Sequence, residues 1–141
     1  MRLENCFERR LLRKIKPSLE KAKRSLAVAK KKLEEARVAF DSGLLSSCII
    51  MAYTAMFHAA RALLYKDGIQ EKSHVCTVEY LRKKYSQELP AYLINALDAH
   101  RIERHEVLYG IEFVPTKEDC ETIIEDAEDF IGKVEKILRL K

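Results

Sequence analysis

The sequence predicts an all-α fold, and three observations support that class. Glycine and proline are scarce, at four and three in 141 residues, whereas 48% of the residues are hydrophobic and 34% are charged. That balance is typical of a helix-rich globular domain. Apolar residues recur every three or four positions, the period of one helix face, and no stretch alternates as a strand does. We therefore expect an antiparallel up-and-down bundle of four to five helices.

The first sixteen residues predict a short basic helix ahead of the bundle. Four apolar side chains recur there at four-residue spacing: Leu3, Phe7, Leu11 and Ile15. A long amphipathic helix follows Ser18 and reaches about Phe40, with apolar positions alternately three and four apart, as in a coiled-coil seam. We expect residues 17–141 to form a single bundle domain, which is an ordinary domain size.

The central helix of the bundle is predicted to run from about Leu44 to Tyr65. It is apolar nearly all round, and the small side chains of Ala52, Ala55 and Ala59 allow neighbouring helices to approach closely. Its apolar run is short for a membrane span, which needs about 20 residues. We therefore expect a buried core helix and no membrane contact.

Three more helices are predicted after it. Ser73 can cap a shorter helix that begins at His74, and Pro90 fits the first turn of the next helix. That helix continues to about Tyr109. Thr116 and Asp119 together resemble a capping box, which predicts the start of the last helix.

The cysteines give no sign of a metal or redox site. They are scattered along the chain and form no CxxC pair: Cys6, Cys48, Cys76 and Cys120. Zinc sites and thioredoxin-like motifs depend on such pairs, so we predict neither a metal nor a cofactor. The N-terminus lacks the apolar run of a signal peptide. We therefore expect a cytoplasmic protein with free thiols.

Charge is distributed unevenly along the chain. The first forty residues carry thirteen lysines and arginines against five carboxylates, whereas residues 112–129 hold eight carboxylates and one lysine. A basic segment can attract nucleic acid, and an acidic one can meet a basic partner. Two solvated helix faces of opposite sign would give the same pattern.

The helix that ends at Tyr109 carries polar residues where its apolar pattern should continue. Five residues share one face by their spacing: Ile94, Leu97, Arg101, His105 and Leu108. A buried, unpaired arginine is very costly, so Arg101 must meet a carboxylate or line a wet cleft. A guanidinium can grip a phosphate while an imidazole exchanges a proton near neutral pH. Arg101 and His105 are therefore candidate catalytic residues, and Arg104 with His100 forms a second pair around the helix.

The block YTAMFHAARALL at residues 53–64, followed by Ser73-His74 and by RIERHEVLYG at residues 101–110, resembles the HEPN family of prokaryotic helical proteins. The resemblance covers residues 18–140. It implies a helical bundle that forms a homodimer and acts beside a minimal nucleotidyltransferase, as a module of toxin–antitoxin type. Some family members are metal-independent ribonucleases, and others are binding modules.

The spacing of Arg101 and His105 departs from the pattern of the active ribonucleases. In those proteins four to six residues separate an arginine from the histidine, whereas three residues lie between Arg101 and His105. The resemblance also implies a tyrosine two positions after the histidine, which a partner nucleotidyltransferase can adenylylate. Val107 occupies that position here, and Tyr109 lies four after His105.

Three hypotheses follow from these residues. In the first, an HEPN-type protein binds nucleotide or RNA phosphates near Arg101, Arg104 and His105, with His100 and Tyr109 alongside, and acts with a nucleotidyltransferase. In the second, a metal-independent endoribonuclease uses His105 as acid or base and Arg101 as phosphate clamp. In the third, a structural dimerisation module pairs Arg101 with a carboxylate of the last helix.

Overall fold

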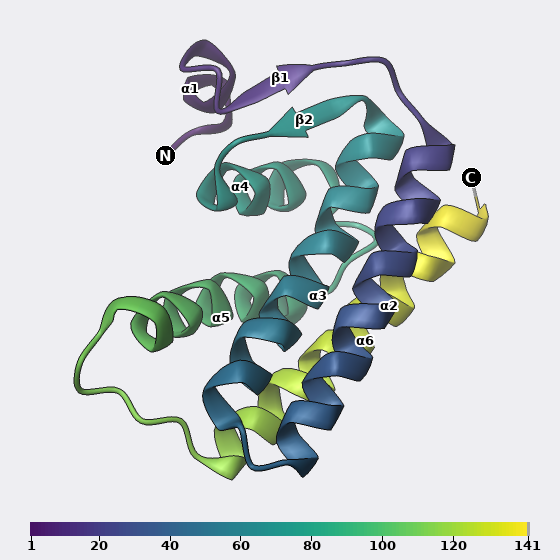
Figure 1. Cartoon of the computed structure of the whole chain (residues 1–141). Helices are drawn as coiled ribbons and strands as arrows, with labels where there is room; N and C mark the ends of the chain where they lie inside the picture. The colour runs from purple at the N-terminus through teal and green to yellow at the C-terminus, as the bar shows by residue number, and fades with distance from the viewer. Residues whose placement is uncertain (141) are drawn as a thin grey trace.

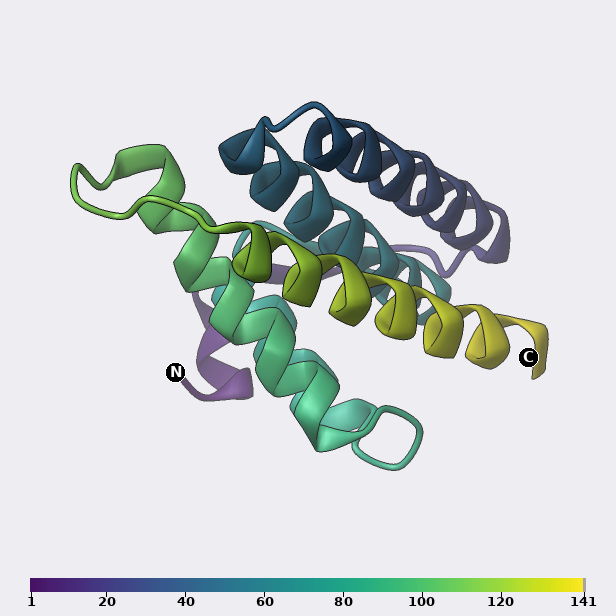
Figure 2. The same ribbon diagram turned by 90° about the horizontal axis from the view of Figure 1, so that it is seen from below.

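Three long helices form the body of the molecule in this computed structural model, which describes residues 1–140. They are α2 (Leu19–Asp41), α3 (Leu45–Asp67) and α6 (Lys117–Leu140). Helix α6 lies alongside both α2 and α3, while α5 (Ala91–Tyr109) crosses them at a steep angle (Figures 1 and 2). The predicted all-α bundle is confirmed.

Helix α3 lies at the centre of this bundle, as its all-round apolar sequence predicts. It packs against α2, α5, α6 and the shorter α4 (His74–Lys84). Ala52, Ala55 and Ala59 are fully buried along it. By length and composition alone α3 could cross a membrane, yet 67% of its most apolar window is buried inside the protein. It is therefore a core helix.

Local side-chain caps set the start of three helices, α2, α4 and α6. The backbone N–H of Lys21 donates to Ser18 Oγ at 3.0 Å, and that of Cys76 donates to Ser73 Oγ at 3.1 Å. The predicted capping box before α6 is confirmed, because the N–H groups of Thr116 and Asp119 donate to each other's side chains at 2.9 and 3.1 Å.

The N-terminal segment differs from the predicted sixteen-residue helix. Helix α1 covers only Leu3–Glu8, because Arg10 takes a left-handed φ of 59°. The N–H groups of Arg10 and Leu11 then donate to the carbonyls of Phe7 and Cys6, which closes the helix with a Schellman motif. This turn redirects the chain away from the helical path.

A small sheet follows that turn, although no strand is predicted from the sequence. Strand β1 (Leu12–Lys14) pairs antiparallel with β2 (Ile69–Glu71), so that Leu12 lies opposite Glu71. Leu12 and Ile69 are buried, which anchors the sheet on the core. The expectation of a strand-free chain is wrong here, because two three-residue strands are too short to show a periodic pattern.

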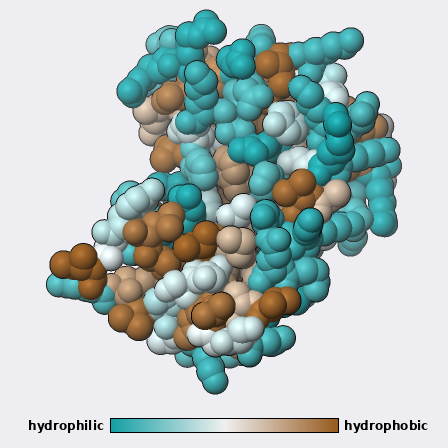
Figure 3. Space-filling view, in the orientation of Figure 1, coloured by the Kyte–Doolittle hydropathy of each residue, from teal (hydrophilic) through white to brown (hydrophobic). Residues whose placement is uncertain are grey.

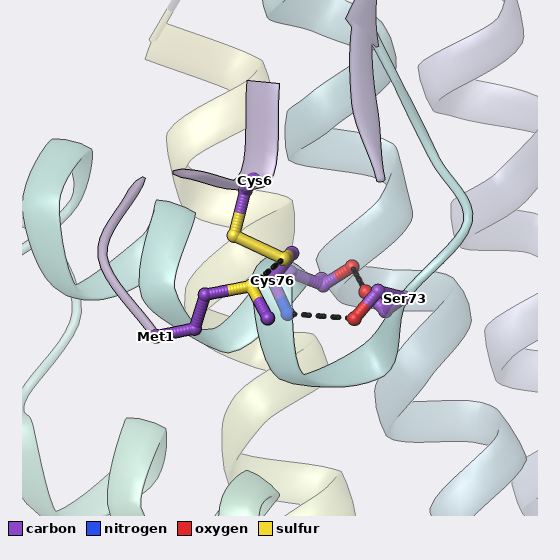
Figure 4. Close-up of a disulfide and its surroundings, with 5 residues drawn as sticks. Met1, Cys6, Ser73 and Cys76 are labelled. Atoms are coloured by element: carbon purple, nitrogen blue, oxygen red, sulfur yellow. Dashed lines mark hydrogen bonds between the residues drawn. A yellow bond between two sulfur atoms is a disulfide. The ribbon is translucent and has the colours of Figure 1, made fainter. Parts of the chain in front are cut away.

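The expectation of four free thiols is also wrong. Cys6 of α1 and Cys76 of α4 form a disulfide whose Cα atoms lie 5.8 Å apart, beside Met1 and the cap residue Ser73 (Figure 4). Seventy residues separate the two cysteines in the sequence, and the β1–β2 pairing brings their helices together. Cys48 and Cys120 are free and buried.

Candidate functional site

The apolar face of α5 turns as the helix proceeds. Leu93, Ile94 and Leu97 are buried as expected, but the next buried position is His100. Arg101 is half-buried and His105 is exposed. The predicted continuation of the buried stripe through Arg101, His105 and Leu108 is therefore wrong, and these residues lie at the border with solvent instead.

His100 occupies the buried position because two carboxylates satisfy its imidazole. Nδ1 lies 3.0 Å from Glu103 Oε1, and Nε2 lies 2.7 Å from Asp126 Oδ2 of α6. Burial by itself lowers the pKa of His100, but the hydrogen bonds and charges of Glu103 and Asp126 outweigh it and raise the pKa above its ordinary value. His100 thus ties α5 to α6.

The two arginines of this helix differ in their partners. Arg101 Nε donates to Asp98 Oδ1 at 2.9 Å, within the same helix. The hypothesis that Arg101 pairs with the last helix is therefore wrong, since His100 makes that connection. The guanidinium carbon of Arg104 lies 5.7 Å from the centre of the Tyr53 ring on α3. Among the described residues, no carboxylate lies within ion-pair distance of Arg104.

His105 and Tyr109 lie at the accessible end of α5. Their ring centres are 4.8 Å apart and tilted by 50°. Both side chains are exposed. Arg101 therefore engages Asp98 while His105 contacts Tyr109, so the two candidate catalytic groups have different neighbours one helical turn apart.

A third histidine, His74, lies where α3, α4 and α5 meet. Its Nδ1 is 2.7 Å from the hydroxyl of the buried Tyr53, and its ring stacks on Phe57 with centres 3.9 Å apart. Burial lowers the pKa of His74 to about 4, and the charges of Arg104, Arg61 and Arg101 act in the same direction. His74 begins α4, as predicted.

Arg61 completes this junction from α3. It lies over the Phe57 ring at 5.0 Å, and its Nε donates to the buried Glu71 of β2 at 2.7 Å. Sequence reasoning missed the junction, although Tyr53, Phe57 and Arg61 are each four residues apart and so share one face of α3. That spacing was the available signal.

Exposed apolar side chains surround the end of α5. Figure 3 shows hydrophobic surface gathered over this helix and the loop that follows it. We call these residues the end patch: Ile102, Leu108, Tyr109, Ile111 and Val114. Ile111 is 97% exposed, which is unusual for a large aliphatic residue.

Potential metal ligands are dispersed in the described structure. Across residues 1–140, no three or more His, Cys, Asp or Glu side chains are grouped so that they could hold a metal ion.

These features define an α-helical bundle protein with arginines and an accessible histidine on its crossing helix. The family model described as HEPN domain matches residues 15–137 of the chain. The chain belongs to the HEPN family, as its sequence resemblance predicts.

Two archaeal relatives are similar over most of their length. The chain is 36% identical over 111 residues to a "UPF0332 protein" of Archaeoglobus fulgidus, covering 74% of this chain and 85% of the relative. It is 25% identical over 122 residues to "Putative toxin MJ0605" of Methanocaldococcus jannaschii, covering 81% of this chain and 86% of the relative.

Proposed function

We propose that this chain is a toxin-like HEPN protein that binds the phosphates of RNA or of a nucleotide on α5. Arg104 is the observation that carries the proposal, because its guanidinium is half-buried against Tyr53 and has no carboxylate partner among the described residues. A guanidinium that is held by packing and left unneutralised is suited to bidentate contact with phosphate. Arg101, His105 and Tyr109 extend the same helix face.

His100 has a different place in this proposal. Both of its ring nitrogens are engaged by carboxylates, so it positions α5 on α6 rather than contacting the ligand. The phosphate contacts are assigned to Arg101 and Arg104, with His105 and Tyr109 beside them.

Protein partners are proposed to cover the aliphatic residues of the end patch, which leaves Tyr109 beside the phosphate contacts. Large exposed apolar patches on a protein surface mark interaction sites. We assign this surface to a second copy of the chain, and a minimal nucleotidyltransferase to the resulting dimer as the partner of a toxin–antitoxin module. The toxin role extends the name of the Methanocaldococcus relative to this chain. Stable complex formation with a minimal nucleotidyltransferase would support the pairing, and two separate peaks in size-exclusion chromatography at micromolar concentration would contradict it.

The proposed site of action is the cytoplasm, where RNA and nucleotides are present. The Cys6–Cys76 disulfide fits that location if the chain comes from a hyperthermophile. Disulfides are rare in most cytosolic proteins but common in intracellular proteins of hyperthermophilic archaea and bacteria.

A metal-independent endoribonuclease is the second candidate function, and the exposure of His105 favours it. In this reaction His105 accepts the proton of a ribose 2′-hydroxyl as that oxygen attacks phosphorus. The bond from phosphorus to the 5′-oxygen then breaks, and the leaving oxygen takes a proton from water. The arginines offset the charge that develops on the phosphate oxygens.

Binding and cleavage of a short fluorescein-labelled RNA by the full chain separate these functions. For binding, fluorescence anisotropy should show that Arg104→Ala lowers the affinity for RNA about tenfold. A loss of that size corresponds to one hydrogen bond to a charged group. Arg139→Ala on α6 is the matched control, because this exposed arginine pairs with Glu135, and it should change little. Equal affinity of wild type and Arg104→Ala would contradict the proposal.

For cleavage, wild-type protein should cut RNA in EDTA and His105→Ala should not. If the wild type binds RNA but leaves it intact, the binding function stands and the nuclease is ruled out.

A further inference from the structure

We propose that His74 is a phosphate ligand, donating its Nε2–H to an oxygen of a phosphate group whose charge Arg61 and Arg104 offset. The ligand class is a phosphate monoester or diester, as in a nucleotide or the RNA backbone. The inference rests on the proposed function and deepens it, because it adds the α3–α4–α5 junction to the phosphate contacts of α5.

The hydrogen bond to Tyr53 fixes which nitrogen of His74 carries the proton. The Tyr53 side chain is buried, and His74 Nδ1, at 2.7 Å, is the one partner of its hydroxyl among the described residues. If Nδ1 carried a proton and donated it, the phenolic O–H would remain buried without an acceptor, which is costly. Tyr53 therefore donates to Nδ1, and the proton of the neutral imidazole is on Nε2.

The Nε2–H group of His74 is available to a ligand. No described residue bonds to it, and every buried side-chain nitrogen or oxygen in the described structure has a partner. Nε2 is therefore reached by solvent. The imidazole is held rigidly, with Tyr53 bonded at one nitrogen and Phe57 stacked on its face, so little order has to be gained on binding.

The charges around His74 favour an anion. Arg61 lies 5.0 Å from the centre of the Phe57 ring on which His74 stacks, and Arg104 lies 5.7 Å from the centre of the Tyr53 ring whose hydroxyl bonds to His74. Besides burial, the charge of Arg101 also lowers the pKa of His74. Glu71 pairs with Arg61, and Asp98 pairs with Arg101. Arg104 remains without a carboxylate, so the junction keeps an excess of positive charge beside a neutral N–H donor.

The position of His74 at the start of α4 agrees with this preference. Ser73 caps the helix, and His74 is its first residue. The backbone N–H groups and the dipole of the first helical turn favour a negative ligand at that end. The N-terminus of α4 therefore adds to the attraction for an anion, but the arginines and the imidazole define the site without it.

A bound phosphate should change the titration of His74. The charged and titratable groups that face this junction come from three elements: Tyr53 and Arg61 of α3, Glu71 of β2, and Asp98, Arg101 and Arg104 of α5. In the free protein, burial and the arginines hold the pKa of His74 at about 4. A phosphate beside Nε2 favours the protonated imidazole, so its pKa rises and, by linkage, the ligand binds more tightly as His74 is protonated.

Side-chain NMR of the histidines in the full-length oxidised protein tests this directly. Inorganic phosphate, AMP, and a short RNA with or without a 5′-phosphate are the probes. We expect the Nε2 resonance of His74 to shift with each phosphate probe that binds and its pKa to rise from about 4. Response to AMP and inorganic phosphate alone assigns the site to nucleotides, whereas response to both RNAs assigns it to the RNA backbone. A saturating phosphate ligand that leaves His74 unshifted would overturn the inference.

Two matched substitutions check the role of Nε2 without removing the side chain. In His74→Gln the amide nitrogen falls near the position of Nε2, whereas in His74→Asn it falls near Nδ1. Affinity for the responding probe should stay within a few-fold of wild type for His74→Gln and fall about tenfold for His74→Asn. Equal affinities of the two variants, both folded by circular dichroism, would contradict the inference.

Failure of this inference differs from failure of the proposed function. If RNA binds and Arg104→Ala weakens binding while His74 stays unshifted, the function stands and the His74 contact is wrong. If inorganic phosphate shifts His74 but RNA does not bind, the contact stands and the RNA-binding function is wrong.

Discussion

His100 connects α5 to α6 through Asp126, with 2.7 Å between His100 Nε2 and Asp126 Oδ2. The connection lies one helical turn before Arg104, so it sets the position of the arginine proposed to bind phosphate. Since the second ring nitrogen contacts Glu103 at 3.0 Å, the imidazole is held at both ends.

The pH dependence of stability follows from this pair. Folding raises the pKa of His100 above its ordinary value of about 6.5, so the folded chain binds protons more tightly than the unfolded chain. The contribution of His100 to the free energy of unfolding is therefore full below about pH 6.5 and is lost as the pH rises through the pKa of the folded state. His100→Ala should lower the Tm and flatten the alkaline side of the Tm-versus-pH curve. An unchanged alkaline slope in the variant would show that the ion pair is absent in solution.

The titration of His74 should make stability change with pH in the opposite direction. Burial lowers the pKa of His74 to about 4, so its neutral form is favoured by folding. The contribution of neutral His74 to the free energy of unfolding is full above about pH 6.5 and declines as the pH falls towards 4. Thermal unfolding of His74→Gln should therefore lose part of the acid-side decline. If wild type and variant decline equally below pH 6.5, the low pKa of His74 is contradicted.

The disulfide predicts a large effect of reduction. Linking residues 70 positions apart restricts the unfolded chain, which corresponds to about 4 kcal/mol in the chain-entropy description. Dithiothreitol should lower the free energy of unfolding of the wild type by a similar amount. Cys6→Ser provides the control, because it should begin less stable and show no further loss on reduction. Equal stability of the oxidised and reduced wild type would mean that the bond is not formed.

Gly68 ends α3 at a close approach to the N-terminal segment. Its φ is 79°, and an added Cβ would lie 2.6 Å from the carbonyl oxygen of Ile15. Gly68→Ala should therefore destabilise the fold by about 1–3 kcal/mol, measured by urea unfolding. Gly132→Ala is the matched control: a Cβ there meets nothing within 4 Å, and alanine in a helix should add about 0.5–1 kcal/mol. If Gly132→Ala lost stability and Gly68→Ala did not, the close approach of Gly68 to Ile15 would be refuted.

A substitution in the end patch should change dimerisation without changing the stability of the folded chain. Ile111→Asp should shift the chain from dimer to monomer in sedimentation velocity, because a charge placed in an apolar interface is costly to bury. The Tm extrapolated to low concentration should change little, since Ile111 is 97% exposed. Val38→Asp on α2 is an exposed control outside the patch. A wild-type chain that is monomeric at high micromolar concentration would remove the proposed dimer.

Local sequence signals predicted the fold better than the site. Ser73 and Thr116 cap their helices as expected because each cap acts within three residues. The β1–β2 pairing and the Cys6–Cys76 bond join distant segments, and no local pattern encodes such contacts.

The site depended on one such distant contact. The spacing on α5 allowed either Arg101 or His100 to follow Leu97 towards the core. Asp126 of α6 decides between them, because it satisfies the buried imidazole. The environment of His74 was not predicted for a similar reason: His74 of α4 bonds to Tyr53 of α3, and Arg104 of α5 lies over the same Tyr53 ring, so three helices must meet there.

The salt dependence of RNA affinity shows whether α5 binds phosphate through Arg104. Anisotropy titrations of wild type and Arg104→Ala across a range of salt concentrations give the slope of log affinity against log salt. Each lost phosphate contact should reduce that slope by about one, so we expect weaker binding and a shallower slope for Arg104→Ala. Superimposable plots for the two proteins would contradict it.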